Sequence, residues 1–250
     1  MINLFRSTAF SYPKTDSKQN EDSVLVTKKI NDGFILAIAD GVGSYEGAYH
    51  ASSTTIKYLN NLQNFDFIDG EKLFSGLKDN LRKISINNDN YRNAATTLTL
   101  AFLNKNKLYI AHIGDCRLYV LIDNKLKCLT KDHTQHQKFL DEKIYTKKEL
   151  KELNGGNIIT SAISEKFLRK YDFFSVPISE LIQKDGKISL FLMSDGAHHY
   201  WEERPRFSIN TMNNILRFSN SLSNRIVNKG LIDDSSFIGA EFIIAENNIV

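Results

Sequence analysis

The chain has 250 residues, and its 32 Lys and Arg residues exceed its 29 Asp and Glu residues by a formal charge of +3. So small and scattered an excess argues against nucleic-acid binding, which needs a concentrated basic surface. The hydrophobic fraction of 42% excludes a disordered or collagen-like chain, and no apolar run reaches the roughly 18 residues of a membrane span.

Strand-like runs and helical periodicity alternate along the first hundred residues. Apolar runs at 24–26 and 34–39 predict two strands. Apolar residues then recur at helical spacing between residues 48 and 62 and again between 73 and 84, which predicts a pair of helices.

Four further runs, at 98–103, 108–113, 118–122 and 126–129, predict strands joined by short Asn-, Asp- and Gly-rich spacers. Such spacing is typical of an antiparallel meander. The polar stretch 134–156 predicts a surface flap, with one small helix opened by the capping-box pattern Thr146 to Glu149. A strand at 188–193, one or two helices within 209–226 and a strand at 237–244 complete the order.

This order of elements predicts one α+β domain spanning residues 1–250, with helices packed on antiparallel sheets. The N-terminal segment is interrupted by Arg6 and Pro13, which argues against a signal peptide. Cys116 and Cys128 are too few for a disulfide framework or a zinc site, so we expect a reduced, cytoplasmic protein.

Carboxylates stand at the ends of the apolar runs, at Asp40, Asp115, Asp195 and Asp233-Asp234, and Asn20-Glu21-Asp22 precedes the first run. A buried carboxylate costs several kcal/mol unless a positive charge compensates it, so their convergence indicates bound cations. Ligands that are all oxygen favour Mg²⁺ or Mn²⁺. A single Asp-Gly pair is more often an ordinary turn, but four acidic strand ends favour the cations.

Eight short motifs in this order resemble the metal-dependent protein serine/threonine phosphatases of type 2C (the PPM family), and most of all their bacterial single-domain members. The motifs are Asn20-Glu21-Asp22, Ala39-Asp40-Gly41-Val42-Gly43, Ala95-Thr96-Thr97-Leu98, Gly114-Asp115-Cys116-Arg117, Leu129-Thr130-Lys131-Asp132-His133-Thr134, Asn157-Ile158-Ile159-Thr160, Ser194-Asp195-Gly196 and Asp233-Asp234-Ser235. The resemblance implies a four-layer α-β-β-α sandwich of two antiparallel sheets flanked by helix pairs.

The resemblance also implies the site residues. Asp40 would bridge two Mn²⁺ or Mg²⁺ ions, with the Gly41 carbonyl as a further ligand. Asp195 and Asp234 would complete the shell of the first ion, and Glu21 and Asp22 would serve the second directly or through water. Asp115, together with Asp195, would hold a weak third ion. The principal catalytic residues would be Asp40 and Asp195.

The implied activity is hydrolysis of phosphoserine and phosphothreonine on proteins, by direct attack of a water that bridges the metal ions. The partners would be phosphorylated proteins and an opposing Ser/Thr kinase, without nucleic acid or membrane, and the protein would be a monomer. Two alternatives stay open: a catalytically weak or inactive relative that serves as a regulatory or binding module, and an unrelated metal-dependent hydrolase.

The chain departs from the family pattern at several positions. Ser17 stands where the family has a phosphate-binding Arg, with Lys14 and Lys18 nearby. Cys116 replaces a Ser, and Ser161 and Ser164 stand where Arg and Gly are common. His198 and His199 follow Ser194-Asp195-Gly196 and could supply a general acid, although an exposed loop or helix start is the simpler interpretation.

Overall fold

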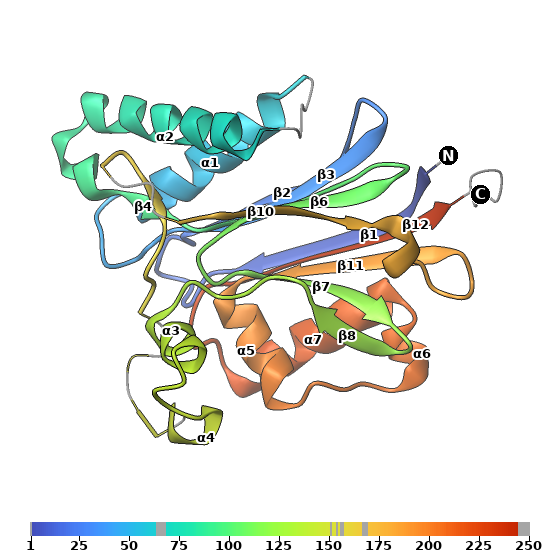
Figure 1. Cartoon of the computed structure of the whole chain (residues 1–250). Coiled ribbons are helices and arrows are strands. Elements are labelled where there is room, and N and C mark those ends of the chain that lie inside the picture. The colour runs from blue at the N-terminus through green and yellow to red at the C-terminus, as the bar shows by residue number, and fades with distance from the viewer. Residues whose placement is uncertain are drawn as a thin grey trace.

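The computed structural model describes residues 2–63, 69–150, 152, 153, 155, 158–166 and 170–244. Two five-stranded antiparallel sheets pack against each other, and helices cover the outer face of each sheet (Figure 1). This α-β-β-α layering confirms the predicted fold class. That residues 1–250 form one domain, with a flap at about 134–156, stays a prediction.

The strands divide into three sheets. The first sheet has the order β1 (Ile2–Tyr12), β12 (Ser235–Ile244), β11 (Lys187–Met193), β7 (Arg117–Ile122) and β8 (Lys125–Cys128). The second sheet has the order β10 (Asp172–Pro177), β6 (Lys107–Ile113), β5 (Leu98–Leu103), β3 (Gly33–Asp40) and β2 (Asp22–Ile30). A small sheet pairs β4 (Ala95–Thr96) with β9 (Ile163–Ser164).

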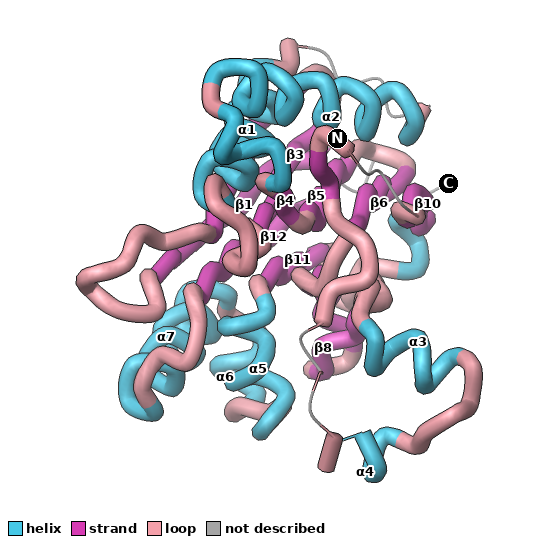
Figure 2. Tube along the Cα trace, turned by 90° about the vertical axis from the view of Figure 1, so that its left-hand side faces the viewer, coloured by secondary structure: helices cyan, strands magenta, loops and turns pink. Residues whose placement is uncertain are grey.

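The long helices form the two outer layers (Figures 1 and 2). Helices α1 (Ala48–Asn61) and α2 (Gly70–Asn87) pack on the second sheet, whereas α5 (Asp195–Glu203), α6 (Ile209–Met212) and α7 (Ile215–Lys229) pack on the first. Short helices α3 (Gln135–Asp141) and α4 (Lys147–Leu150) project to one side, and η1 (Asp89–Asn93) and η2 (Ile178–Glu180) are 3₁₀ turns. The predicted helices at 48–62, 73–84 and 209–226 are confirmed.

Three layers of apolar side chains hold the sandwich together, and β3 contributes to two of them. Its residues Ile35 and Ala37 face α1 and α2, whereas Leu36 and Ile38 face the first sheet. Successive side chains of a strand point to opposite faces, so a strand buried on both faces is apolar throughout. The strand ends at Asp40, which places this carboxylate at the end of the core.

The predicted four-stranded meander is wrong, because the chain changes sheets in its middle. β5 and β6 pair in the second sheet, and β7 and β8 pair in the first. The crossing occurs at Gly114, whose φ of 105° lies in the region that glycine adopts without steric cost. The crossing also carries Asp115 away from the strands.

Several elements lay outside the sequence predictions. After Ile2, β1 alternates exposed and half-buried residues and includes the polar Arg6, Ser7 and Thr8, so its apolar content is too low to mark a strand. α5 begins at Asp195 and fulfils the suggestion of a helix start at the histidine pair. In the flap, the capping box is confirmed, since Glu149 N–H lies 3.3 Å from Thr146 Oγ1 and Thr146 N–H donates to Glu149 Oε2 at 2.7 Å. No helix in the described ranges combines the length and apolarity of a membrane span.

Candidate metal centre

Two of the acidic residues lie opposite each other on neighbouring strands of the second sheet. β2 and β3 are antiparallel, and their register pairs Asp22 with Asp40. Directly opposed residues in such a pair have Cβ atoms about 4.5–5.5 Å apart, and like charges at that distance destabilise the sheet. Glu21 lies next to this pair, because its carbonyl accepts a hydrogen bond of 3.1 Å from Gly41 N–H.

Gly41 is required by the close packing of the chain at this point. A Cβ atom built on Gly41 would lie 2.5 Å from the Ala48 carbonyl oxygen and 3.0 Å from the Glu21 carbonyl oxygen. Only glycine therefore fits between the start of α1 and the segment that precedes β2.

The first sheet brings further carboxylates to the same end of the sandwich. β11 and β12 are antiparallel neighbours, so the end of β11 lies beside the start of β12. Ser194 joins them, because its N–H donates to the Ser236 carbonyl at 3.0 Å and its hydroxyl accepts from Ser236 N–H at 2.8 Å. Asp195 follows Ser194, and Asp233 and Asp234 precede β12.

Asp115 reaches the cluster from the crossing between the sheets. Its backbone is held by His198, whose Nε2 lies 3.0 Å from the Asp115 carbonyl oxygen, and Gly114 N–H donates to His133 Nδ1 at 3.2 Å. The Asp115 side chain is buried, and its Oδ1 has no hydrogen-bond partner.

The electrostatics of the cluster indicate a deficit of positive charge. Burial raises the pKa of Asp40 well above its usual range, and the charges of Asp22, Asp195, Asp115 and Asp233 raise it further. Burial also raises the pKa of Asp195 to about 6 and that of Asp115 well above its usual range. The pKa of Glu21 is raised by burial and by the nearby charges of Asp234 and Asp233.

Asp22 is the clearest case. Burial raises its pKa to about 7, against smaller opposing effects of the Ser236 and Ser194 hydroxyls, and neither oxygen has a hydrogen-bond partner of regular geometry. A buried carboxylate without a partner is costly, and a divalent cation supplies the missing charge. The donor set is all oxygen, so the residues fit Mg²⁺ or Mn²⁺ in their chemistry.

The carboxylates are not yet arranged as a closed set of ligands. In the part of the chain that is described, no group of three or more Asp, Glu, His or Cys side chains could hold a metal ion as it stands.

The hydrogen bonds of Asp234 favour its neighbour Asp233 as the ligand, and the sequence-based assignment of Asp234 stays a prediction. Both Asp234 oxygens accept hydrogen bonds of 2.6 Å, one from Lys14 N–H and one from Glu21 N–H. The charge of Asp233 raises the pKa of Asp195 more than the charge of Asp234 does.

The positions that depart from the family pattern lie at the edge of the cluster. Ser17 is exposed in a turn, with its Oγ 3.3 Å from Thr15 Oγ1. The charge of Lys18 acts on Glu21, and Lys14 Nζ lies 3.8 Å from Asp233 Oδ1. Cys116 is buried, with its Sγ 3.3 Å from Thr97 Oγ1, as expected of a small core residue.

Neither histidine of the pair is placed as a general acid. His198 is buried, and burial together with the charge of Arg117 lowers its pKa to about 3, so it is neutral at physiological pH. His199 is exposed, and its Nε2 lies 3.9 Å from Glu203 Oε1. The simpler interpretation, a helix start, holds.

Comparisons with known proteins agree with this arrangement. The sequence pattern described as "Protein phosphatase 2C" matches residues 14–231. A putative protein phosphatase of Mycoplasma genitalium is 27% identical over 210 residues, which cover 78% of each chain. The serine/threonine phosphatase stp of Listeria welshimeri is 25% identical over 215 residues, which cover 82% of this chain and 81% of that protein.

Solved structures share the fold at low sequence identity. Stp1 of Staphylococcus aureus is 21% identical with a TM-score of 0.77, over 97% of this chain and 96% of that one. The catalytic domain of PstP in complex with 2 manganese ions is 22% identical with a TM-score of 0.72, over 98% of this chain and 100% of that one.

Proposed function

Because this chain belongs to the protein phosphatase 2C family, we propose that it is a Mn²⁺- or Mg²⁺-dependent phosphatase acting on phosphoserine and phosphothreonine in proteins. The serine/threonine phosphatase name of the Listeria relative supports the substrate class, and the manganese ions of PstP support the metal. Its partners are then phosphorylated proteins and the Ser/Thr kinase that opposes it. We further propose that it acts as a monomer in the cytoplasm.

One observation carries the proposal: carboxylates from both sheets meet where Asp22 and Asp115 keep buried oxygens without a hydrogen-bond partner. An ordinary folded protein satisfies such atoms, so their persistence is expected at a site that binds a cation. Structural turns formed by Asp and Gly would leave the carboxylates in solvent.

Asp40 is the central residue of the proposed site, since the charges of Asp22, Asp195, Asp115 and Asp233 all act on it. We assign Asp40 to both principal cations, with the Gly41 carbonyl beside it. Asp195 and Asp233 would hold one cation and Glu21 and Asp22 the other. Asp115, with Asp195, would hold a third and weaker one.

When bound, the cations would neutralise phosphate oxygens and lower the pKa of a water molecule so that it attacks phosphorus without a covalent enzyme intermediate. The chain's own side chains fix the position of the reaction. Lys14 and Lys18 lie exposed beside Asp233 and Glu21, where their charges attract a phosphate dianion. Ser17 offers one neutral hydroxyl in place of an Arg side chain.

The test is hydrolysis of a phosphoserine peptide and a small aryl phosphate with Mn²⁺, with Mg²⁺ and with a chelator. Activity should require the metal, and Asp40→Asn should lower turnover by orders of magnitude. Asp185→Asn is the matched control, because Asp185 is an exposed carboxylate paired with Lys187 near the opposite end of β11. Full activity after chelation would overturn the proposal. Mn²⁺ binding in calorimetry without any hydrolysis would support the inactive binding module instead.

A further inference from the structure

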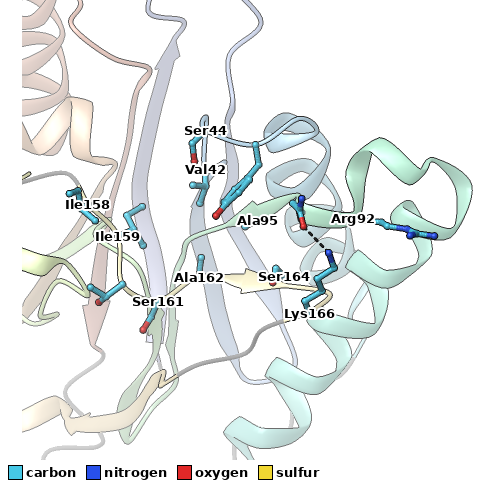
Figure 3. Close-up of a pocket in the computed structure, with 13 residues that line it drawn as sticks. Val42, Ser44, Arg92, Ala95, Ile158, Ile159, Ser161, Ala162, Ser164 and Lys166 are labelled. Carbon is cyan, nitrogen blue, oxygen red and sulfur yellow. Dashed lines mark hydrogen bonds between the residues drawn. The ribbon is translucent and has the colours of Figure 1, made fainter.

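A groove of about 570 Å³ opens beside the candidate metal centre (Figure 3). We call it the basic groove, and three segments line it. The loop after β3 contributes Val42 and Tyr45, the end of η1 and the start of β4 contribute Arg92 and Ala95, and the segment around β9 contributes Ile159 and Lys166.

The groove is continuous with the carboxylate cluster through backbone hydrogen bonds. Thr97 N–H donates to the Asp40 carbonyl at 2.8 Å, and Val42 N–H donates to the Ala95 carbonyl at 2.9 Å. Ala95 in turn pairs with Ser164 across the small sheet. Since adjacent Cα atoms are 3.8 Å apart, the groove begins within about 8 Å of Asp40.

The charge of the groove is one-sided. Among the described residues, its lining contains Arg92 and Lys166 and no acidic side chain. Arg92 is already paired with Asp89, at 3.1 Å between Nη2 and Oδ1. Lys166 Nζ donates to Asn93 Oδ1 at 2.9 Å, so the partner it has in the described structure is a neutral amide (Figure 3). Lys166 is exposed, so its ammonium group can meet a carboxylate of a bound peptide.

The rest of the lining suits an extended peptide. Val42, Ile158 and Ile159 provide apolar surface, and the groove is open to solvent at Tyr45, which is 46% exposed. A phosphoprotein must place the chain on either side of its phosphorylated residue against the enzyme, and this groove begins two residues after Asp40.

We propose that the basic groove binds an acidic segment of the phosphoprotein substrate a few residues from its phosphorylated side chain, with Lys166 pairing with an Asp or Glu of that segment. This inference rests on the proposed function and names a substrate preference for it. The groove reaches from Val42, two residues after Asp40, to Lys166, so an extended substrate chain would bring a residue near Lys166 a few positions from the phosphorylated side chain.

The experiment compares kcat/KM for phosphoserine peptides whose neighbouring residues are three Ala, three Glu or three Lys, placed on the N-terminal or the C-terminal side. The wild type should prefer the Glu peptide over the Ala peptide by about three- to fivefold on one side, the size of a partly exposed ion pair. The preference should shrink between low and high salt, because salt screens exposed charges.

Substitutions then assign the preference to the groove. Lys166→Glu should remove it or reverse it toward the Lys peptide, and Lys166→Ala should give an intermediate ratio. Lys125→Glu is the matched control, since Lys125 is an exposed lysine in the β7–β8 hairpin, at the far end of β7 from Asp115. It should keep the wild-type ratio. A wild-type ratio near one, or an unchanged ratio in Lys166→Glu, would overturn the inference.

The two proposals fail in different ways. If the aryl phosphate is hydrolysed but the peptides show no preference, only the proposal for the basic groove is overturned, and the proposed function stands. If no phosphoester is hydrolysed at all, the proposed function fails. The proposal for the basic groove is then tested by fluorescence anisotropy, which measures the binding of peptides that carry a phosphonate in place of phosphoserine. Equal affinities for the Glu and Ala phosphonate peptides would then count against it.

Discussion

Asp233 and Asp234 are neighbours in the chain, yet their carboxylates have different surroundings. Asp234 accepts hydrogen bonds from two backbone amides, those of Lys14 and Glu21, whereas Asp233 is half-exposed and acts on Asp40 and Asp195. Asp234 thus fastens the segment before β2 to the start of β12. Asp233 Oδ1 accepts a hydrogen bond of 3.0 Å from Asp234 N–H and lies 3.8 Å from Lys14 Nζ, at the exposed edge of the cluster.

We expect Asp233→Asn to weaken Mn²⁺ binding by at least about tenfold, because a ligand charge is lost. Asp234→Asn should change Mn²⁺ affinity by less than about threefold, but it should lower the free energy of unfolding by about 1–2 kcal/mol, since one amide loses a charged acceptor. Calorimetric titration and urea unfolding measure the two effects. The reverse pattern would restore Asp234 as the ligand.

Much of the candidate site could be proposed from the sequence, because the acidic residues stand just before or just after apolar runs. The distinction between Asp233 and Asp234 could not, since it depends on amides of Lys14 and Glu21 that lie more than 200 positions earlier in the chain. The unpartnered oxygens of Asp22 are likewise a property of packing between sheets.

His112 makes the stability of the metal-free protein depend on pH. It is buried, Nδ1 lies 2.9 Å from Thr99 Oγ1, and Nε2 lies 3.0 Å from the Lys131 carbonyl oxygen. Burial and the neighbouring charge of His133 lower its pKa from 6.5 to about 4. Between these values the unfolded chain binds the proton and the folded chain does not, so stability falls as pH falls from 6.5 to 4.

We expect the protonation of His112 to lower the free energy of unfolding of the wild type by about 2–3 kcal/mol between pH 7 and pH 4. His112→Gln removes the titrating group, so the variant should lose correspondingly less over that range even if it is less stable at pH 7. Urea unfolding of both proteins with chelator present, at matched pH values, gives the difference. Parallel losses in the two proteins would show that His112 does not titrate in this range.

At the scale of elements, the start of α5 sets the distance between Asp195, which follows β11, and Asp233, which precedes β12. A Cβ atom on Gly196 would lie 2.1 Å from the Asp234 carbonyl oxygen and 2.9 Å from Ser235 Oγ. The first of these contacts is with backbone, so the helix itself would have to move. Such a movement would separate Asp195 from Asp233.

Gly196→Ala should therefore lower the free energy of unfolding by about 1–3 kcal/mol, the usual cost of overpacking, and should also weaken Mn²⁺ binding. His199→Ala is the control within the same helix, because His199 is exposed. It should leave Mn²⁺ affinity near the wild-type value. Wild-type stability and affinity in Gly196→Ala would show that α5 can shift without disturbing the site.

The strands that the sequence predicted each contain a continuous apolar run, and the predicted helices each show a clear helical period. β5 begins and ends at the predicted residues, Leu98 and Leu103. β4 and β9 contain two residues each, too few for any periodicity, and β10 places polar Asp172 and Ser175 in its run. The meander failed because turn residues indicate a reversal of the chain but not the sheet that the next strand joins.

At the scale of the molecule, the proposed ligands come from both sheets. Asp22 and Asp40 belong to the second sheet, and Asp195 and Asp233 adjoin strands of the first. A cation held by both groups would bind the folded protein and not the unfolded chain, whose ligands are dispersed. Binding would therefore stabilise the whole sandwich.

We expect Mn²⁺ at about a hundred times its dissociation constant to raise the melting temperature by about 5–10 °C, which corresponds to about 2.7 kcal/mol for a chain of this size. K⁺ at the same ionic strength should not do so, and Asp40→Asn should remove most of the shift. Differential scanning calorimetry measures it. An equal shift in Asp40→Asn would locate the stabilising ion elsewhere.

The pairing of β1 with β12 has a consequence for how the protein is made. Tyr12 pairs with Ser235 and Ile2 with Ile244, so β1 finds its partner only after some 220 further residues have been synthesised. Asp233 and the start of β12 arrive in that same late stretch. The nascent chain can therefore form its second sheet before β12 is made, but the proposed metal centre, and the activity that depends on it, must wait until Asp233 has been synthesised.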